Sequence, residues 1–381
     1  WPNKDHQADE VDSMMISVAV PDGVMDVSNG RLRSAEKMDG GYTRYNWFVS
    51  YPINNYNVSL NIADYAHFSD TFEGEKGKLS LDYFVLKENL DKARVQFNAD
   101  VKPMLKCFEH WFGPYPFYRD GFKLVETPYL GMEHQSAVAY GNKYRKGYLG
   151  RDLSGTGLGL KWDFIIIHEA GHEWFGNNIT SKDLADMWIH ESFTSYSEGL
   201  FVECTQGKEA GARYLAGTRK SIQNDQPIIG PYHVNKEGSG DMYPKGANML
   251  HTVRTIINND QKWRGILRGL NKEFGLKTTT TEAVVSFINK TSGRNLTKVF
   301  DQYLRYADIP DLELKDNPNG SLSYRWKANV KGFDMPVRVK KSGENNWITL
   351  VPSTEWKGIS GMLAENIEVD TFNFYINVSK Q

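Results

Sequence analysis

Two histidines four positions apart are the residues of this sequence most able to do chemistry. His168 and His172 frame the run His-Glu-Ala-Gly-His, which has the pattern H-E-x-x-H and lies in an apolar, helix-compatible stretch. Positions i and i+4 of a helix share one face, so both imidazoles can reach one metal ion. Zinc binds histidine nitrogens at about 2.0–2.1 Å, and Glu169 would then lie near the open coordination position as a general base. The motif therefore predicts a hydrolytic zinc site.

A catalytic zinc site needs a third protein ligand and leaves its fourth position to water. Glu191 is the candidate, because it follows the second histidine by 191 − 172 = 19 positions in a second amphipathic segment. Apolar residues recur there at helical spacing, namely Ile189, Phe193, Tyr196 and Leu200. Two packed helices joined by a short connection would bring this carboxylate to the metal.

These two segments together resemble those of the gluzincin aminopeptidases, the family of aminopeptidase N and the leukotriene hydrolases. H-E-x-x-H followed by eighteen residues and a Glu is the signature of that family, and the resemblance extends to the Trp-Phe-Gly-Asn continuation, Asp183 and Trp188. It implies a zinc metallopeptidase that removes the N-terminal residue from peptides with a free N-terminus. It also implies one Zn²⁺ per chain, held by His168, His172 and Glu191.

The segment Leu-Gly-Met-Glu-His at 130–134 is similar to the family's Gly-x-Met-Glu-Asn motif. In the family this motif forms an edge strand that lines the cleft and pairs with the peptide by strand addition. The resemblance implies that Glu133 binds the substrate's free α-amino group, and that Met132 and Gly131 contribute to substrate binding. The first and last positions depart from the pattern, because Leu and His replace Gly and Asn. The side-chain preference of the first subsite is therefore left open.

The run Tyr-Pro-Lys-Gly that begins at Tyr243 resembles the family's Tyr-x-Lys-Gly motif at the start of a helix, 243 − 191 = 52 positions after the third ligand. The resemblance implies that the Tyr243 hydroxyl donates a hydrogen bond to the oxyanion formed when water attacks the scissile carbonyl. Such a donor typically contributes about 10²–10³ in rate. Without the resemblance, Tyr243 could be only an aromatic residue at the start of a helix.

Composition narrows the class of protein. The chain has 381 residues, a formal net charge of −2, and charged and aromatic fractions of 24% and 13%. This length predicts two or three domains with real cores, and the charge offers no basic field for nucleic acid. We expect no nucleic-acid partner, and no apolar stretch reads as a transmembrane segment. The chain starts at Trp1 without Met, so we expect its N-terminus to be truncated, and an export signal cannot be assessed. The cellular compartment and the oligomeric state therefore stay open.

Periodicity predicts a multidomain α+β fold in three parts. Residues 1–88 alternate like strands (Ile16 to Val20, Val58 to Ile62, Leu79 to Val85) and are expected to form the C-terminal part of an N-terminal β-domain. Trp1 to Asp9 resembles a segment partway through that domain in the family, so its first part is expected to be absent. Residues 89–310 are expected to be a thermolysin-like, mainly helical zinc catalytic domain, and residues 311–381 a small C-terminal β-sandwich-like domain. Strict alternation at 322–330 and 372–378 supports the last part.

Helical patterns cover 91–111, 245–259, 261–274, 281–291 and 296–306. The first is expected to bury an apolar stripe made of Val95, Val101, Leu105, Phe108 and Phe112. The two cysteines, Cys107 and Cys204, lie in helix-like segments far apart in sequence, so a disulfide framework is not expected.

Two other functions share part of this pattern. A zinc endopeptidase of the thermolysin type also carries H-E-x-x-H, and dependence on a free amine would separate the two. An inactive peptide-binding module could retain the fold, although it would need neither Glu169 nor Tyr243. An epoxide hydrolase side activity, as in one branch of the family, and the preferred N-terminal residue stay open at this stage.

Overall fold

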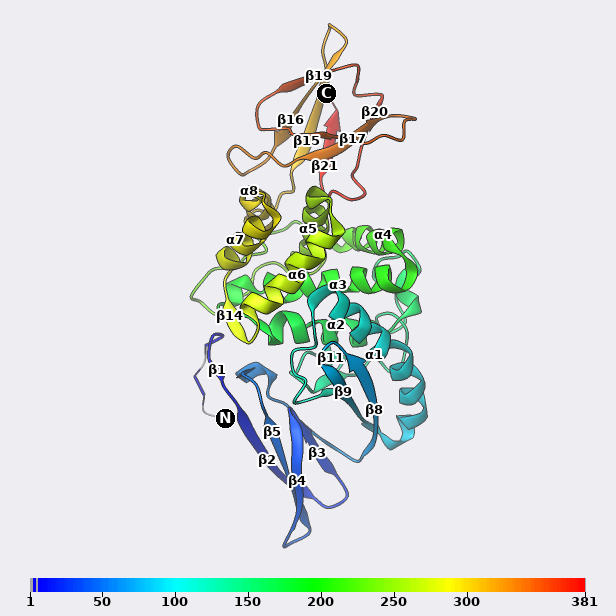
Figure 1. Ribbon diagram of the computed structural model, residues 1–381, viewed down its shortest axis with the longest axis vertical. Coiled ribbons are helices and arrows are strands. Elements are labelled where there is room, and N and C mark those ends of the chain that lie inside the picture. The colour runs from blue at the N-terminus through cyan, green and yellow to red at the C-terminus, as the bar shows by residue number, and fades with distance from the viewer. Residues whose placement is uncertain (1–2, 5, 381) are drawn as a thin grey trace.

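The computed structural model describes residues 3, 4 and 6–380 and is elongated. Figure 1 shows N-terminal strands at one end, a helical tier in the middle, and the strands from β15 to β21 around the C-terminus at the other end. Of the segment expected to resemble the middle of an N-terminal β-domain, Trp1, Pro2 and Asp5 lie outside the described residues. In the part of the chain that is described, no helix is long and apolar enough to cross a membrane.

The N-terminal strands pair antiparallel, as the alternation predicts. They are β1 (Glu10–Val11), β2 (Met14–Pro21), β3 (Met25–Ser28), β4 (Arg31–Met38), β5 (Tyr42–Val49), β6 (Ile53–Asn54) and β7 (Leu60–Ala63). In β2, Ile16 and Val20 are buried as expected. In β7 the apolar side chains point outward: Leu60 is 53% and Ile62 50% exposed. Asn61 lies inward instead, because its Nδ2 donates to the Val27 carbonyl at 3.0 Å.

A mixed sheet with the order β11-β12-β10-β9-β8 lies under the helices. Its strands are β8 (Tyr65–Gly74), β9 (Gly77–Leu86), β10 (Phe122–Glu126), β11 (Gly131–Met132) and β12 (Val138–Tyr140). β9 pairs parallel with β10, so the sheet continues across the boundary expected at residue 88. The β8–β9 hairpin therefore belongs to the same sheet as β10–β12, which lie on the other side of that expected boundary. β11 is an edge strand.

The helical tier contains α1 (Leu90–Phe112), α2 (Phe164–Gly171), α3 (Trp188–Gln206), α4 (Lys208–Thr218), α5 (Pro244–Ile257), α6 (Asp260–Phe274), α7 (Thr281–Ser292) and α8 (Thr297–Arg305). The expected helices all form within a residue or two of their predicted ends. A short parallel pair, β13 (Ile179–Ser181) and β14 (Lys277–Thr279), lies beside them. The prediction that Val95 belongs to the buried stripe of α1 is wrong. Val95 is 74% exposed, because the buried face of the helix runs through Ala93, Phe97 and Val101.

The expectation of no disulfide is also wrong. Cys107 on α1 and Cys204 on α3 are bonded, with Cα atoms 6.0 Å apart and a sequence separation of 97. The two helices pack against each other, and this tertiary contact brings together cysteines whose spacing gave no signal. Cys107 is buried, whereas Cys204 is exposed.

The C-terminal strands form two sheets that share a core with the helices. They are β15 (Asp311–Asp316), β16 (Ser321–Lys327), β17 (Val337–Lys341), β18 (Ile348–Leu350), β19 (Lys357–Ser360), β20 (Ile367–Val369) and β21 (Asn377–Lys380), in the orders β19-β16-β15-β21 and β18-β17-β20. The alternating residues up to Trp326 form a strand, as expected. Residues 372–376, which were also expected to form a strand, do not. That segment instead packs on the helices, where Tyr303 Oη donates to the Tyr375 carbonyl at 2.6 Å.

Candidate functional site

The helix that carries H-E-x-x-H begins at a buried cap. Asp163 accepts hydrogen bonds from the backbone N–H groups of Ile165 and Ile166 at 3.1 and 3.4 Å. Its carboxylate also accepts from the side chains of Gln96 and Tyr140, each at 2.7 Å. Burial raises the pKa of Asp163 to about 6. The capped first turn of α2 fixes the direction in which the two histidines leave the helix.

A π-helical turn over Glu173–Asn177 follows His172. Gly176 has φ = 132°, a conformation that favours glycine, and a Cβ there would lie 3.2 Å from His172 Nδ1. The turn brings the Phe175 carbonyl to 3.0 Å from His172 Nδ1. Turns of this kind recur at functional sites, and here the turn orients the second histidine.

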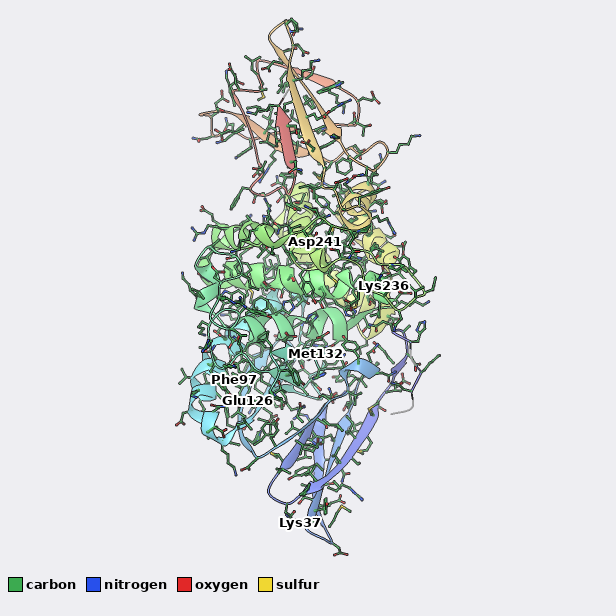
Figure 2. All side chains as sticks on the ribbon, turned by 180° about the vertical axis from the view of Figure 1, so that it is seen from behind. Lys37, Phe97, Glu126, Met132, Lys236 and Asp241 are labelled. Carbon is green, nitrogen blue, oxygen red and sulfur yellow. A yellow bond between two sulfur atoms is a disulfide. The ribbon has the colours of Figure 1, made fainter. Side chains whose placement is uncertain are left out.

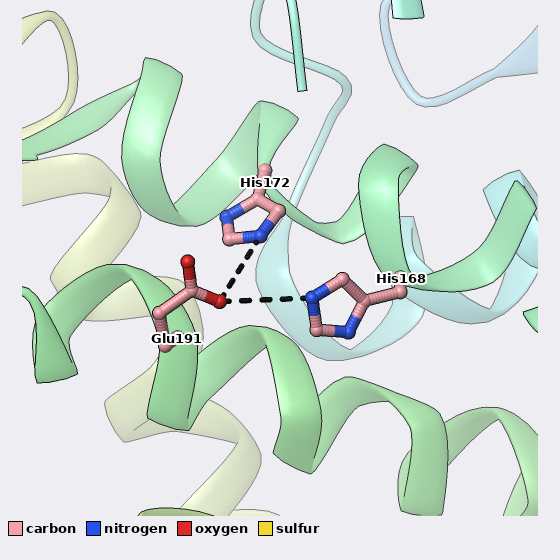
Figure 3. Close-up of side chains that lie close together, drawn as sticks. All are labelled: His168, His172 and Glu191. Atoms are coloured by element: carbon pink, nitrogen blue, oxygen red, sulfur yellow. Dashed lines mark ion pairs between the residues drawn. The ribbon is translucent and has the colours of Figure 1, made fainter. Parts of the chain in front are cut away.

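The two histidines and Glu191 converge from adjacent helices (Figure 3). Glu191 Oε2 lies 3.6 Å from His168 Nε2 and 3.4 Å from His172 Nε2. The ligating atoms of the three residues all lie within 4.8 Å of one another, and all three side chains are buried. The structure thus brings together the ligands that the sequence predicts.

These residues fit a zinc ion. A tetrahedral ion with bonds of about 2.0–2.1 Å holds its ligand atoms roughly 3.3 Å apart, close to the separations seen here. Glu191 Oε2 is buried and hydrogen bonds to no group in the described part of the chain. Its contacts with the two histidine nitrogens are longer than an ordinary hydrogen bond, and a cation held between the three residues would satisfy this buried oxygen.

The Nδ1 atom of each histidine already has a partner within the protein. His168 Nδ1 lies 2.7 Å from Glu198 Oε1, and Glu198 Oε2 accepts from Tyr214 Oη at 2.7 Å. Together with the Phe175 contact, this leaves both Nε2 atoms facing Glu191, as in zinc sites where a carboxylate or carbonyl fixes the histidine tautomer. No role for Glu198 was predicted from the sequence. Its spacing is the signal that could have found it, because it follows Glu191 by 198 − 191 = 7 positions, which is two helical turns on the same face.

The charges of the site stabilise one another. Burial opposes a charge on His168 and His172, but nearby carboxylates outweigh it: they raise the pKa of His168 well above its usual value and that of His172 to about 9. Burial likewise disfavours the Glu191 carboxylate, and the two histidines nevertheless hold its pKa below the usual range.

Glu169 is buried between this cluster and the edge strand β11. Burial raises the pKa of Glu169 to about 7, and the carboxylate of Glu133 adds to the effect. Gly131 is needed for the close approach of the strand, because a Cβ there would lie 2.8 Å from Glu169 Oε1 and 2.8 Å from Ile165 Cγ2. A carboxyl group that titrates near neutrality suits a general base.

Glu133 lies beside Glu169 and His172, with one ligand atom of each within 4.8 Å of the others. Its side chain is 6% exposed. Its backbone carbonyl accepts from Asn177 Nδ2 at 2.7 Å, which ties it to the end of the zinc-site helix. Met132 precedes it on β11, and Figure 2 shows this residue in the middle of the molecule, between the N-terminal sheet and the helices.

Tyr243 lies at the start of α5 and stacks on His168, with ring centroids 6.0 Å apart. Ser192 Oγ donates to the Met242 carbonyl at 2.7 Å, which fastens this turn to α3. Burial, and then the Glu191 carboxylate, raise the pKa of Tyr243, so its hydroxyl stays protonated. Lys245 of the same motif points elsewhere: its Nζ donates to the Tyr306 and Ala307 carbonyls.

A cavity of about 360 Å³ opens beside His168, Glu169 and Tyr243. Its other walls are mainly apolar, and they include Leu130, Tyr148, Leu153, Phe164, Ile165 and Ala247. Its composition suits an apolar side chain of a ligand positioned at the site.

The site therefore combines the two histidines of an H-E-x-x-H motif with one carboxylate from a neighbouring helix, a set that could hold a metal ion. The family model "Peptidase family M1 domain" matches residues 96–303, and the chain belongs to this family.

Curated relatives agree with this assignment. Endoplasmic reticulum aminopeptidase 1 of Mus musculus is 23% identical over 67% of this chain and 28% of its own length. A probable aminopeptidase 1 of Sulfurisphaera tokodaii is 24% identical over 77% of this chain and 38% of its own. Glutamyl aminopeptidase of Sus scrofa is 23% identical over 91% and 38%. The chain thus spans well under half the length of these relatives.

Solved structures show the same fold. Aminopeptidase A of Legionella pneumophila, in complex with aspartic acid, has a TM-score of 0.78 and 14% identity, covering 97% of this chain and 45% of that one. An M1 zinc metallopeptidase mutant from Deinococcus radiodurans, bound to a Tyr-Ser-Ala substrate, has a TM-score of 0.65 and 18% identity, covering 80% and 66%. The fold is thus the mixed α and β, multidomain fold of M1 aminopeptidases.

Proposed function

We propose that this chain is a zinc aminopeptidase that hydrolyses the first peptide bond of peptides with a free N-terminus. The observation that carries the proposal is Glu133, a buried carboxylate that lies beside Glu169 and His172. A buried anion gains by pairing with an ammonium ion, and an internal residue of a long peptide offers none. Three relatives that are named as aminopeptidases support the same proposal.

One zinc ion would be held by His168, His172 and Glu191. When bound, it supplies a more acidic water and polarisation of the scissile carbonyl. Glu169, with a pKa of about 7, is half-ionised near neutral pH and can take the proton from the attacking water. The same carboxylic acid then gives that proton to the leaving amine.

Tyr243 would stabilise the oxyanion of the tetrahedral intermediate. Its hydroxyl stays protonated because burial and the Glu191 carboxylate raise its pKa. The contact with His168 places the ring beside the metal ligands. A preorganised donor at this point lowers the barrier because it meets charge that develops only in the transition state.

Glu133 would anchor the substrate ammonium, while the edge strand β11, with Gly131 and Met132, would pair with the peptide backbone. With the ammonium fixed, only the first peptide bond can reach Glu169. Without this anchor, the same machinery would suit an endopeptidase.

The division of the chain into three parts belongs to the same proposal. We propose residues 1–88 as part of an N-terminal β-domain whose last hairpin extends the catalytic sheet, residues 89–310 as a thermolysin-like catalytic domain, and residues 311–381 as a β-sandwich-like domain. The shared sheet joins the first part to the second, and the hydrogen bond from Tyr303 to the Tyr375 carbonyl joins the second to the third.

The test uses one peptide in two forms, with its N-terminus free and acetylated, and the zinc-loaded protein. Mass analysis should show loss of the first residue from the free form only. A Glu133→Gln variant should lose this preference, while Glu126→Gln, on the same sheet but bonded to Tyr144 at 2.7 Å, should keep it. Internal cleavage of both forms would make the protein an endopeptidase, and cleavage of neither, despite bound zinc, would leave a binding module.

A further inference from the structure

A second cavity, of about 660 Å³, is formed between α6 and the end of α1. Gly265, Arg268, Gly269 and Lys272 of α6 line it, and their spacing of three and four positions puts them on one face of the helix. Gly265 carries no side chain to fill this space, and a Cβ there would meet no atom within 4 Å. The volume is that of a small-molecule site.

A second group of residues that line this cavity is apolar. Phe112 is the last residue of α1, and Pro114 and Pro116 follow it along the chain. Leu276, just after α6, belongs to the same lining. Because proline fixes its own backbone φ angle, this part of the lining needs little ordering when a ligand binds. It suits the aromatic or aliphatic part of a ligand.

The charged side chains that line the cavity all have one sign. Among the described residues of the lining, Lys76, Arg268 and Lys272 are basic and none is acidic. The Arg268 guanidinium already has a counter-ion, because it donates to the two carboxylate oxygens of Glu75 at 2.8 and 2.7 Å. Lys76 and Lys272 are both exposed, so a ligand can reach their ammonium groups. The cavity therefore has a net positive charge that suits an anion.

The cavity also reaches the segment that orients His172. Phe112 packs edge-on against Phe175, with ring centroids 5.1 Å apart, and the Phe175 carbonyl lies 3.0 Å from His172 Nδ1. Asn178, which follows the π-helical turn, also lines the cavity. This cavity and the one beside the metal ligands share no described lining residue. A ligand in the second cavity would therefore contact residues that support the metal site, without entering that site.

We propose that the second cavity binds a small amphipathic anion, which carries one acidic group on an aromatic or aliphatic body. The ammonium groups of Lys76 and Lys272 meet the acidic group. Phe112 and the two prolines that follow it cover the apolar body. This binding goes beyond the proposed aminopeptidase function and does not depend on it, because none of its contacts involves a residue assigned to catalysis.

The experiment compares two fluorescent probes that differ only in the acidic group, 8-anilinonaphthalene-1-sulfonate and N-phenyl-1-naphthylamine. Fluorescence titration of the zinc-loaded protein gives the dissociation constant of each. In Lys76→Gln/Lys272→Gln, the sulfonate should bind about fivefold or more weakly, because two exposed charge pairs are lost, while the uncharged probe binds as before. The control is Lys106→Gln/Lys290→Gln, which removes two exposed lysines outside the cavity and should leave both constants unchanged.

Gly265→Phe places a ring in the cavity and should lose most of the affinity for both probes. Gly265→Ala is the matched control, because it replaces the same helical glycine, leaves the space open and should bind like the parent. Unchanged binding of both probes in Gly265→Phe would overturn the inference, since the probes would then bind elsewhere. Equal weakening of the sulfonate in the two lysine double variants would also overturn it. If Gly265→Phe does not fold, the lysine variants decide.

Discussion

Glu198 Oε1 lies 2.7 Å from His168 Nδ1, so a residue two helical turns beyond Glu191 orients the imidazole of His168. α3 thus directs the Glu191 carboxylate toward the proposed metal position and the Glu198 carboxylate toward Nδ1 of His168. The buried hydroxyl of Tyr214 holds this second carboxylate in turn.

Glu198→Gln should weaken zinc binding about 10- to 100-fold, the usual cost of removing a carboxylate behind a ligating histidine. A competition titration with a chromogenic chelator measures this affinity. Glu209→Gln, on the exposed start of α4, is the matched control and should bind zinc normally. Unchanged affinity in Glu198→Gln would show that the contact does not support the metal.

Glu169→Gln should keep zinc and lose turnover by about 10²–10⁴-fold, because an amide cannot accept the proton of the attacking water. His168→Ala should lose both zinc and activity. Metal content by atomic absorption and peptide hydrolysis separate the two effects. The mechanism fails if Glu169→Gln hydrolyses peptides at the parent rate.

Tyr243→Phe should lower kcat by about 10²–10³ and change KM little, since the hydroxyl acts on charge that appears only in the transition state. Steady-state kinetics on a free-amine dipeptide amide gives both constants. Tyr306→Phe, an exposed tyrosine at the end of α8, serves as the control. A rise in KM alone would assign Tyr243 to ground-state binding instead.

Loss of the Cys107–Cys204 bond should lower the free energy of unfolding by about 2–5 kcal/mol, because it closes a long loop between two packed helices. Urea unfolding of Cys107→Ala/Cys204→Ser against the oxidised parent measures the difference. Because Cys204 is exposed, a thiol reductant should destabilise the parent to a similar degree and leave the double variant unchanged. Equal stability of the two proteins without reductant would contradict the bond's role.

The stability of the protein should fall with acid partly through His251. This buried residue on α5 contacts Asn373 Oδ1 at 3.1 Å, and burial lowers its pKa from 6.5 to about 4. The unfolded chain therefore takes up a proton below pH 6.5 while the folded chain does not. The stability present above pH 6.5 is lost as pH falls toward 4, by about 1 kcal/mol at pH 5.5.

His251→Gln keeps a hydrogen-bonding group but cannot titrate. Urea unfolding at pH 7.5 and 5.5 should show a smaller acid loss in this variant than in the parent, by about the same 1 kcal/mol. His6→Gln, an exposed histidine, should behave like the parent. Equal acid loss in His251→Gln and the parent would mean that this histidine is not buried neutral.

The sequence by itself predicted the residues that the structure brings together as possible metal ligands, and it predicted most of the helices. Spacing of four within a helix is enough to place His168 and His172 on one face, and periodicity located α1 and α5–α8. Glu191 could be named because its spacing matches a family signature. Local patterns carry this information because helix and strand geometry repeats over a few residues.

Only the tertiary structure decided the contacts between distant segments. The Cys107–Cys204 bond, the sheet that runs past residue 88, and the hydrogen bond from Tyr303 to the Tyr375 carbonyl each join parts of the chain whose spacing follows no short period. The outward faces of Leu60 and Ile62 have the same origin, because alternation marks a strand and not the side that is covered. What each side chain meets depends on how the elements pack, and packing is a property of the whole fold.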